Sequence, residues 1–172
     1  MHDDSPPAQL IADLKNGDED QLREVIRLGE KFLDSQLQAG IAGDQRATTF
    51  ASIISVLAAA LIGFYVAEDS RTMELGWAIL PAAAILLMSA VLASLAARPT
   101  GWWYSGNDPS FWAADLVAKK SLRDSLAEQA AYYDISIKRN RAVLAACSDM
   151  INIAMAIAAA GILYALVGAA TL

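Results

Sequence analysis

Few residues of this chain have the types and spacing that catalysis or metal binding requires. His2 is the only histidine and Cys147 the only cysteine, which excludes histidine-based triads, the common zinc sites and a disulfide within the chain. Neither the Gly-x-x-x-x-Gly-Lys nor the Gly-x-Gly-x-x-Gly pattern of phosphate loops occurs. Residues 18–20, Asp-Glu-Asp, are an acidic cluster of the kind that caps helices far more often than it binds metal. The sequence therefore predicts no enzyme, no cofactor and no metal site.

Three long uncharged segments dominate the rest of the chain. Hydrophobic residues make up 56% of the 172 positions and are concentrated in residues 47–67, 75–97 and 150–172. A helix needs about 20 apolar residues to cross the hydrocarbon core of a bilayer, so each segment is long enough. None contains Asp, Glu, Lys, Arg or His, the side chains that usually mark ion or proton pathways. We predict an all-α membrane protein with three transmembrane helices that is not a transporter.

The basic residues predict the orientation in the membrane. Of the 13 Lys and Arg residues, only Arg71 lies in the loop of residues 68–74. Basic residues are retained on the cytoplasmic side, so this loop is expected outside. Three spans then place the N-terminus in the cytoplasm and the C-terminus outside. The net charge of −6 comes mainly from the first 45 residues and argues against nucleic acid as a partner.

Before the first span and between the second and third, the sequence predicts cytosolic helical extensions, in residues 1–46 and 98–149. A short helix is expected to end near Lys15, and a long one to begin near Gln21 and to continue into the first span. Asp108-Pro109 is typical of a helix start, a capping acid followed by proline. A single straight helix over residues 110–147 would reach roughly 55 Å from the membrane. We expect a turn near residues 121–125 instead; a strongly tilted helix is the alternative.

Aromatic and charged residues cluster where the spans should meet the inner headgroups. Aromatic rings with a polar edge settle at that level, so we expect an interfacial role for Trp102, Trp103, Tyr104, Phe111 and Trp112. Charges expected at the same level are Asp44, Arg46, Arg98, Arg141 and Asp149. Arg46 and Asp149 each precede an apolar block by one residue, so they either pair with each other or are hydrated separately.

Small residues recur at helical spacing in the first and third spans. Such stripes let helix backbones approach closely, which favours association inside lipid. They are Ala51, Ser55, Ala59 and Gly63 in the first span, and either Ala156 with Ala160 or Gly161 with Ala165 in the third. They pack either within one protomer or, as we slightly favour, in a homo-oligomer. Asn152 is expected to make a helix-to-helix hydrogen bond rather than to bind a ligand.

The order of these features resembles a known family. Asp44-Gln45-Arg46-Ala47 precedes the first span, a short acidic loop follows it, and the second span ends near Arg98-Pro99. An Asn-Asp-Pro-Ser-Phe-Trp element at 107–112 then leads to a helix that re-enters the membrane. Over roughly residues 40–165 the chain is similar to the small transmembrane effector domains of bacterial anti-phage nucleotide signalling, the Pycsar transmembrane effector and its SLATT-type relatives.

This resemblance implies a protein that impairs the inner membrane by oligomerising when a cyclic nucleotide signal reaches its cytosolic helices. Because one protomer lacks a polar lumen, any pore would lie between chains. The competing interpretation is a structural or accessory subunit, whose small-residue stripes pack against a larger membrane complex. In both interpretations the expected partners are the lipid bilayer and other membrane helices.

Overall fold

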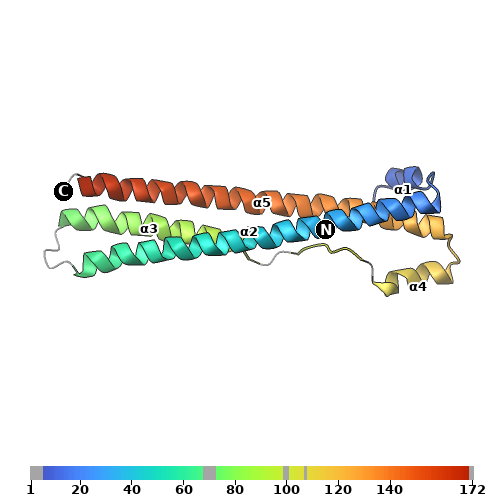
Figure 1. Cartoon of the computed structure of the whole chain (residues 1–172), viewed down its shortest axis with the longest axis horizontal. Helices are drawn as coiled ribbons and strands as arrows, with labels where there is room; N and C mark the ends of the chain where they lie inside the picture. Colours follow the sequence, from blue (N-terminus) through green and yellow to red (C-terminus); the bar gives the residue numbers. More distant parts are fainter. Residues whose placement is uncertain (1–5, 68–72, 99–100, 107, 171–172) are drawn as a thin grey trace. The chain divides into compact units, whose positions relative to one another are not determined.

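The structure, a computed structural model, describes residues 6–67, 73–98, 101–106 and 108–170 (Figure 1). His2 and most of the expected outer loop, residues 68–74, lie outside this range. The described residues form five helices and no strand: α1 (Ala8–Leu14), α2 (Glu19–Ala67), α3 (Met73–Ala96), α4 (Pro109–Val117) and α5 (Leu122–Ala170). Two compact units result. Unit 1 contains Met1–Gly40 and Thr100–Leu144, and unit 2 contains Ile41–Pro99 and Ala145–Leu172.

α2 and α4 begin where local sequence signals predict. The Asp18 side chain accepts a hydrogen bond from the Gln21 backbone N–H at 2.8 Å, and Gln21 Oε1 accepts one from the Asp18 N–H at 3.1 Å. This reciprocal capping starts α2. Asp108 caps α4, with Pro109 next to it, as expected. The long helix that was expected to run from the N-terminal region through the first span is confirmed as α2.

A break separates α4 from α5, which answers the question left open for residues 110–147. Lys119, two residues after the last residue of α4, has a φ of 51°, in the left-handed region where helices stop. Ser121 then caps α5 through its Oγ, which accepts from the Asp124 N–H at 3.1 Å. The expected turn is therefore present, and it lies slightly before residues 121–125.

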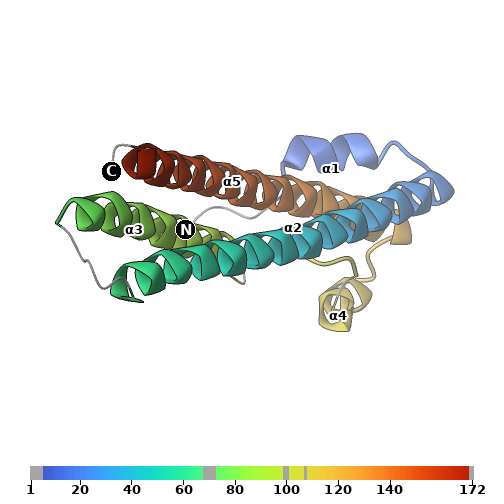
Figure 2. The same cartoon turned by 60° about the vertical axis from the view of Figure 1, so that its left-hand side comes forward.

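In unit 1, the first part of α2 packs against the first part of α5, and α1 and α4 lie on opposite sides of this pair (Figure 2). The core contains side chains from both long helices, and Leu14 of α1 and Trp112 of α4 pack against it. Its buried members are Leu22, Ile26, Leu33, Leu126, Ala127, Ala130 and Tyr133. Other apolar residues of this part of α2, Val25, Leu28 and Phe32, are exposed.

In unit 2, α2 and α5 run in the same direction and α3 runs the opposite way (Figures 1 and 2). Two small clusters hold the three helices together, and alanine dominates them. The buried residues are Ile54, Ala58, Leu86, Ala90 and Ala158 in one cluster and Ala51, Ala93 and Ala154 in the other. Large apolar side chains such as Ile53, Val56, Val91 and Leu163 point outward instead. Small residues inside and large apolar residues outside are typical of helices packed in lipid.

Glycines of α5 allow the closest approach to α3. A Cβ added at Gly168 would lie 2.7 Å from the Ala78 Cβ, whereas one added at Gly63 of α2 would meet nothing within 4 Å. We expect Gly168→Ala to destabilise unit 2 by about 1 to 3 kcal/mol, because the two helices must move apart. Thermal unfolding in detergent, followed by circular dichroism, measures this. Gly43→Ala, where an added Cβ also meets nothing within 4 Å, is the control, and an equal effect of both changes would contradict the packing.

Candidate functional site

The linker segment of residues 101–106 is fixed to both long helices of unit 1. The side-chain amide of Asn140, only 1% exposed, donates to the Trp103 carbonyl at 2.8 Å and accepts from the Trp103 N–H at 3.1 Å. The Arg139 guanidinium lies 5.0 Å from the centre of the Trp103 ring, within the range of a cation–π contact. Trp102 packs on Gly40 so closely that a Cβ there would lie 2.4 Å from Trp102 Cζ2.

The Tyr133 hydroxyl joins the end of this segment to both helices. It donates to Glu30 Oε1 at 3.1 Å and accepts from the Gly106 N–H at 3.0 Å and from Gln129 Nε2 at 3.2 Å. Burial is the largest cause of the raised pKa of Tyr133, and the neighbouring Glu30 charge acts in the same direction. The hydroxyl therefore stays protonated and acts as a structural hydrogen-bond donor. One residue earlier, Ser105 Oγ donates to Asp34 Oδ1 at 2.7 Å.

The expected interfacial aromatics thus differ in their surroundings. Trp102 and Trp103 are half-buried against the long helices, Trp112 packs against the core of unit 1, and Tyr104 is 64% exposed. The side chain of Phe111 lies outside the described part of the chain. Their shared location at the headgroup level stays a prediction. What the sequence did not indicate is that the linker segment has specific partners, Gly40 and Asn140, far away in the chain.

A second polar cluster fixes the corner between α4 and α5. The Lys120 ammonium contacts the carboxylates of Asp115, at 3.4 Å, and of Glu128, and Ser125 Oγ donates to Asp115 at 2.7 Å. The hydrogen bond from Ser125 is the largest cause of the lowered pKa of Asp115, and Lys120 also lowers it. Burial alone would lower the pKa of Lys120, but the bonds and charges of Glu128 and Asp115 outweigh burial and raise it.

The corner should therefore loosen at both pH extremes. A carboxyl whose folded pKa is lowered stabilises the fold above its unfolded pKa and loses this contribution as the pH falls through the folded value, here below 3.8. Lys120 behaves oppositely, since its contribution is lost as the pH rises above 10.5. Proteolysis between α4 and α5 should thus increase below pH 3.8 in the wild type and less steeply in Asp115→Asn. If proteolysis of Asp115→Asn increased below pH 3.8 as steeply as that of the wild type, this prediction would be wrong.

The packing residues predicted from small-residue spacing are mostly outside the protomer core. Ala51 is buried, but Ser55, Ala59 and Gly63 are exposed, as are Ala156 and Ala160. In the third span Gly161, the alternative, is the residue that packs inside, against Ile85 and Leu86. The inward face of α2 is instead Ala51, Ile54 and Ala58. The exposed stripes are not used in the protomer, and their use between chains stays a prediction.

Asn152 does not make its expected bond within the protomer. It is exposed, and its side chain makes no hydrogen bond to another described residue. The interhelical bond comes instead from Ser89 of α3, whose buried Oγ donates to the Ala154 carbonyl at 2.7 Å. The physical reason is helical phase: Ala154 and Ala158 face the core, and two residues correspond to about 200° of rotation.

The predicted interface charges do not form an ion pair within the described part of unit 2. Arg46, Arg98 and Asp149 are exposed, and no salt bridge joins Arg46 to Asp149, which leaves the alternative of separate hydration. Asp44 is half-buried, and its backbone carbonyl accepts a hydrogen bond from Thr48 Oγ1 at 2.8 Å. Arg141, in unit 1, is exposed.

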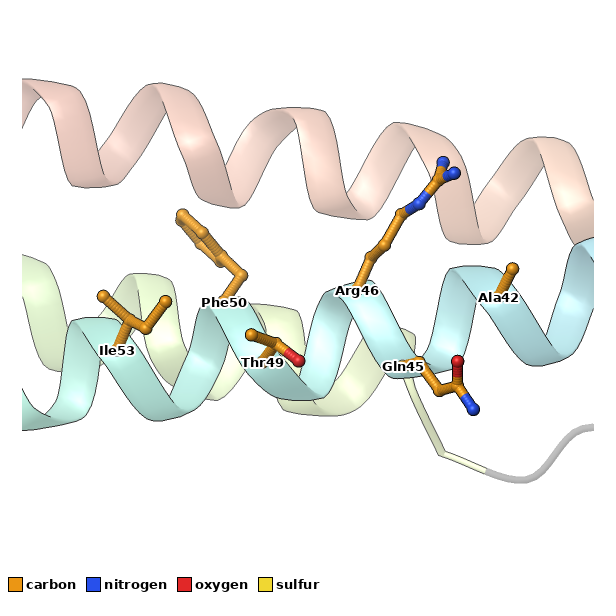
Figure 3. A pocket seen from close by; sticks show the side chains of 6 residues that line it. All are labelled: Ala42, Gln45, Arg46, Thr49, Phe50 and Ile53. Carbon is orange, nitrogen blue, oxygen red and sulfur yellow. The ribbon is translucent and has the colours of Figure 1, made fainter.

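Beside Arg46, α2 has a shallow groove of about 540 Å³. Its lining residues all come from one face of this helix: Ala42, Gln45, Arg46, Thr49, Phe50 and Ile53 (Figure 3). In Figure 3 the side chains of Arg46, Phe50 and Ile53 lie along one edge of this face and that of Gln45 along the other, with Thr49 between them. The groove is open, polar at one end and apolar at the other.

No described group of three or more His, Cys, Asp or Glu residues is placed to hold a metal ion. The fold and these sites define a helical protein with three helices that are long and apolar enough to cross a membrane. Comparison with protein-family models, with curated proteins and with solved structures finds no match to this chain.

Proposed function

We propose that this chain is a non-enzymatic protein of the bacterial inner membrane that impairs the membrane by self-association, under control of a nucleotide signal that acts on unit 1. The observation that supports self-association is the exposed stripe of Ser55, Ala59 and Gly63 in the first span. Within the protomer these small residues contribute nothing to the core. Small exposed residues favour close contacts between helices in lipid, where burial of apolar surface offers no driving force.

The long helices support the second half of the proposal. α2 and α5 each have 49 residues without interruption and contribute to both units. Each helix thus provides a continuous path of backbone hydrogen bonds from unit 1 into unit 2, along which a change at one end can bias the other. The cyclic nucleotide is proposed from the resemblance to the anti-phage effectors.

Two neighbouring alanines provide a matched test of self-association. Ala59 and Ala60 are both exposed, but only Ala59 belongs to the small-residue stripe, since one residue corresponds to about 100° of rotation. We expect Ala59→Leu to abolish oligomers in native mass spectrometry and leakage of dye from liposomes, measured with and without 3′,5′-cyclic nucleoside monophosphates. Ala60→Leu should preserve both. Stoichiometric co-purification with another protein, with no oligomer and no leakage, would favour the accessory subunit instead.

The proposed orientation places unit 1 in the cytoplasm and residues 68–74 outside. In a Cys147→Ser background, Ser70→Cys should react with a membrane-impermeant maleimide in intact spheroplasts. Ser35→Cys, on the exposed surface of α2 in unit 1, should react only after permeabilisation. If Ser35→Cys reacted in intact spheroplasts and Ser70→Cys only after permeabilisation, the orientation would be the opposite one, and the assignment of the three spans would be unaffected.

A further inference from the structure

The groove on α2 lies where the chain changes from charged to uncharged. Arg46 is the last ionisable residue before the uncharged block of residues 47–67. Gln45 and Thr49 add hydrogen-bonding groups around it, and Phe50 and Ile53 form the apolar end. One face of a single helix thus presents a cation, polar groups and then hydrocarbon, in the order of the headgroup and acyl chain of a phospholipid.

The guanidinium of Arg46 is available to a ligand. It is exposed, and no described carboxylate forms a salt bridge with it, although Asp149 was a candidate partner. Asp44, two residues earlier, lies about 200° away around the helix, on another face. A planar guanidinium binds phosphate oxygens through paired hydrogen bonds, which makes arginine suited to a phosphate ligand.

The apolar end of the groove continues along the span. Ile53, Val56 and Phe64 follow at helical spacing on the same face and are 56%, 68% and 57% exposed. One leaflet of hydrocarbon is about 15 Å thick, half of the core. Ten residues of helix cover that distance, so the face from Arg46 to Val56 matches one leaflet.

We propose that this groove binds one anionic phospholipid, with the phosphate on Arg46 and an acyl chain along Phe50 and Ile53. The open shape favours a lipid over a soluble ligand, because an open groove leaves most of a small molecule in contact with solvent, whereas a lipid is already surrounded by hydrocarbon. A zwitterionic lipid brings its own cation, which competes with Arg46 for the phosphate. The proposal depends on membrane insertion and is independent of the effector function.

Native mass spectrometry of the full chain in detergent tests this, with dioleoyl phosphatidylglycerol and dioleoyl phosphatidylcholine as matched probes. We expect one phosphatidylglycerol per protomer to bind at least 10-fold more tightly than phosphatidylcholine, and Arg46→Gln to remove this preference. Arg98→Gln is the control, since Arg98 is an exposed arginine at the end of α3, outside the groove. It should change the affinity by less than about 2-fold, because only its long-range charge is lost.

A second variant distinguishes binding of the lipid headgroup from binding of the acyl chain. Ile53→Ala, at a groove residue that is 56% exposed and outside both core clusters of unit 2, should weaken binding of the dioleoyl lipid about 5-fold or more, through loss of apolar contact, and leave the short dihexanoyl phosphatidylglycerol unchanged. Equal losses with Arg46→Gln and Arg98→Gln would show that only net charge matters, and would overturn the site. The site would also be overturned if Arg46→Gln bound phosphatidylglycerol as tightly as the wild type. Dimers that dissociate in Arg46→Gln without any lipid effect would assign the groove to a second copy of the chain.

Discussion

Replacement of Asn140 by alanine is expected to lower the free energy of unfolding of unit 1 by about 2 to 4 kcal/mol. The side chain is almost completely buried and supplies both hydrogen bonds to the Trp103 backbone. Its removal leaves a peptide N–H and a carbonyl without these partners, and each such group costs about 1 to 3 kcal/mol when it is fully buried. Because Trp103 is half-buried, water compensates part of this cost, which places the expected loss in the lower part of the summed range. Thermal unfolding followed by tryptophan fluorescence, together with hydrogen exchange of residues 101–106, measures the loss.

Asn152→Ala is the matched control for this change. Both asparagines lie in α5, but the side chain of Asn152 is exposed and makes no hydrogen bond to another described residue, so its replacement should change the stability by no more than about 0.5 kcal/mol. If Asn140→Ala left the exchange of residues 101–106 at the wild-type rate, Asn140 would not hold the linker segment.

Gly40→Ala is expected to be the second large effect, in spite of the helical preference for alanine. In an open helix position Gly→Ala stabilises by about 1 kcal/mol. At Gly40, however, the new methyl group would lie 2.4 Å and 2.7 Å from two ring atoms of Trp102, and such overpacking costs about 1 to 3 kcal/mol. We therefore expect a net loss of stability and a change in the near-ultraviolet circular dichroism of the tryptophans.

Two controls make the Gly40 prediction specific. Gly43→Ala, three residues along α2, meets nothing within 4 Å and should stabilise the helix slightly. In a Trp102→Ala background, Gly40→Ala should no longer destabilise, because the ring that it clashes with is gone; a double-mutant cycle measures this coupling. A cycle with no coupling energy would show that the two residues do not pack together.

Together these contacts give the linker segment a structural role that its composition does not indicate. Aromatic rings that combine an apolar body with a polar edge suit a membrane interface. The interfacial location predicted from the sequence therefore concerns only the environment of the segment. The contacts with Gly40, Asn140 and Tyr133 concern its partners. Gln36 also donates to the Ile137 carbonyl at 3.0 Å, while its buried Oε1 has no hydrogen-bond partner among the described residues. Unit 1 therefore uses buried polar groups to match α2 to α5, as polar residues set the register of paired helices.

The sequence by itself determined the features that depend on neighbours along the chain. The three apolar segments follow from composition, and the start of α2 at Asp18 and of α4 at Asp108 follows from capping residues one to three positions away. These signals act within one or two helical turns, so no tertiary contact is needed to find them.

Only the tertiary structure decided which face of each helix is buried. Spacing alone marked Ala51, Ser55, Ala59 and Gly63 as one stripe, but the core takes Ala51 with Ile54 and Ala58. In helices that are apolar on all sides, several faces suit burial equally, and the partner helix selects one of them. The same holds for Ser89, Asn140 and Gly40, whose partners are 65, 37 and 62 residues away in the chain. A single sequence carries no local signal of such pairs, because they exist only once the helices have packed.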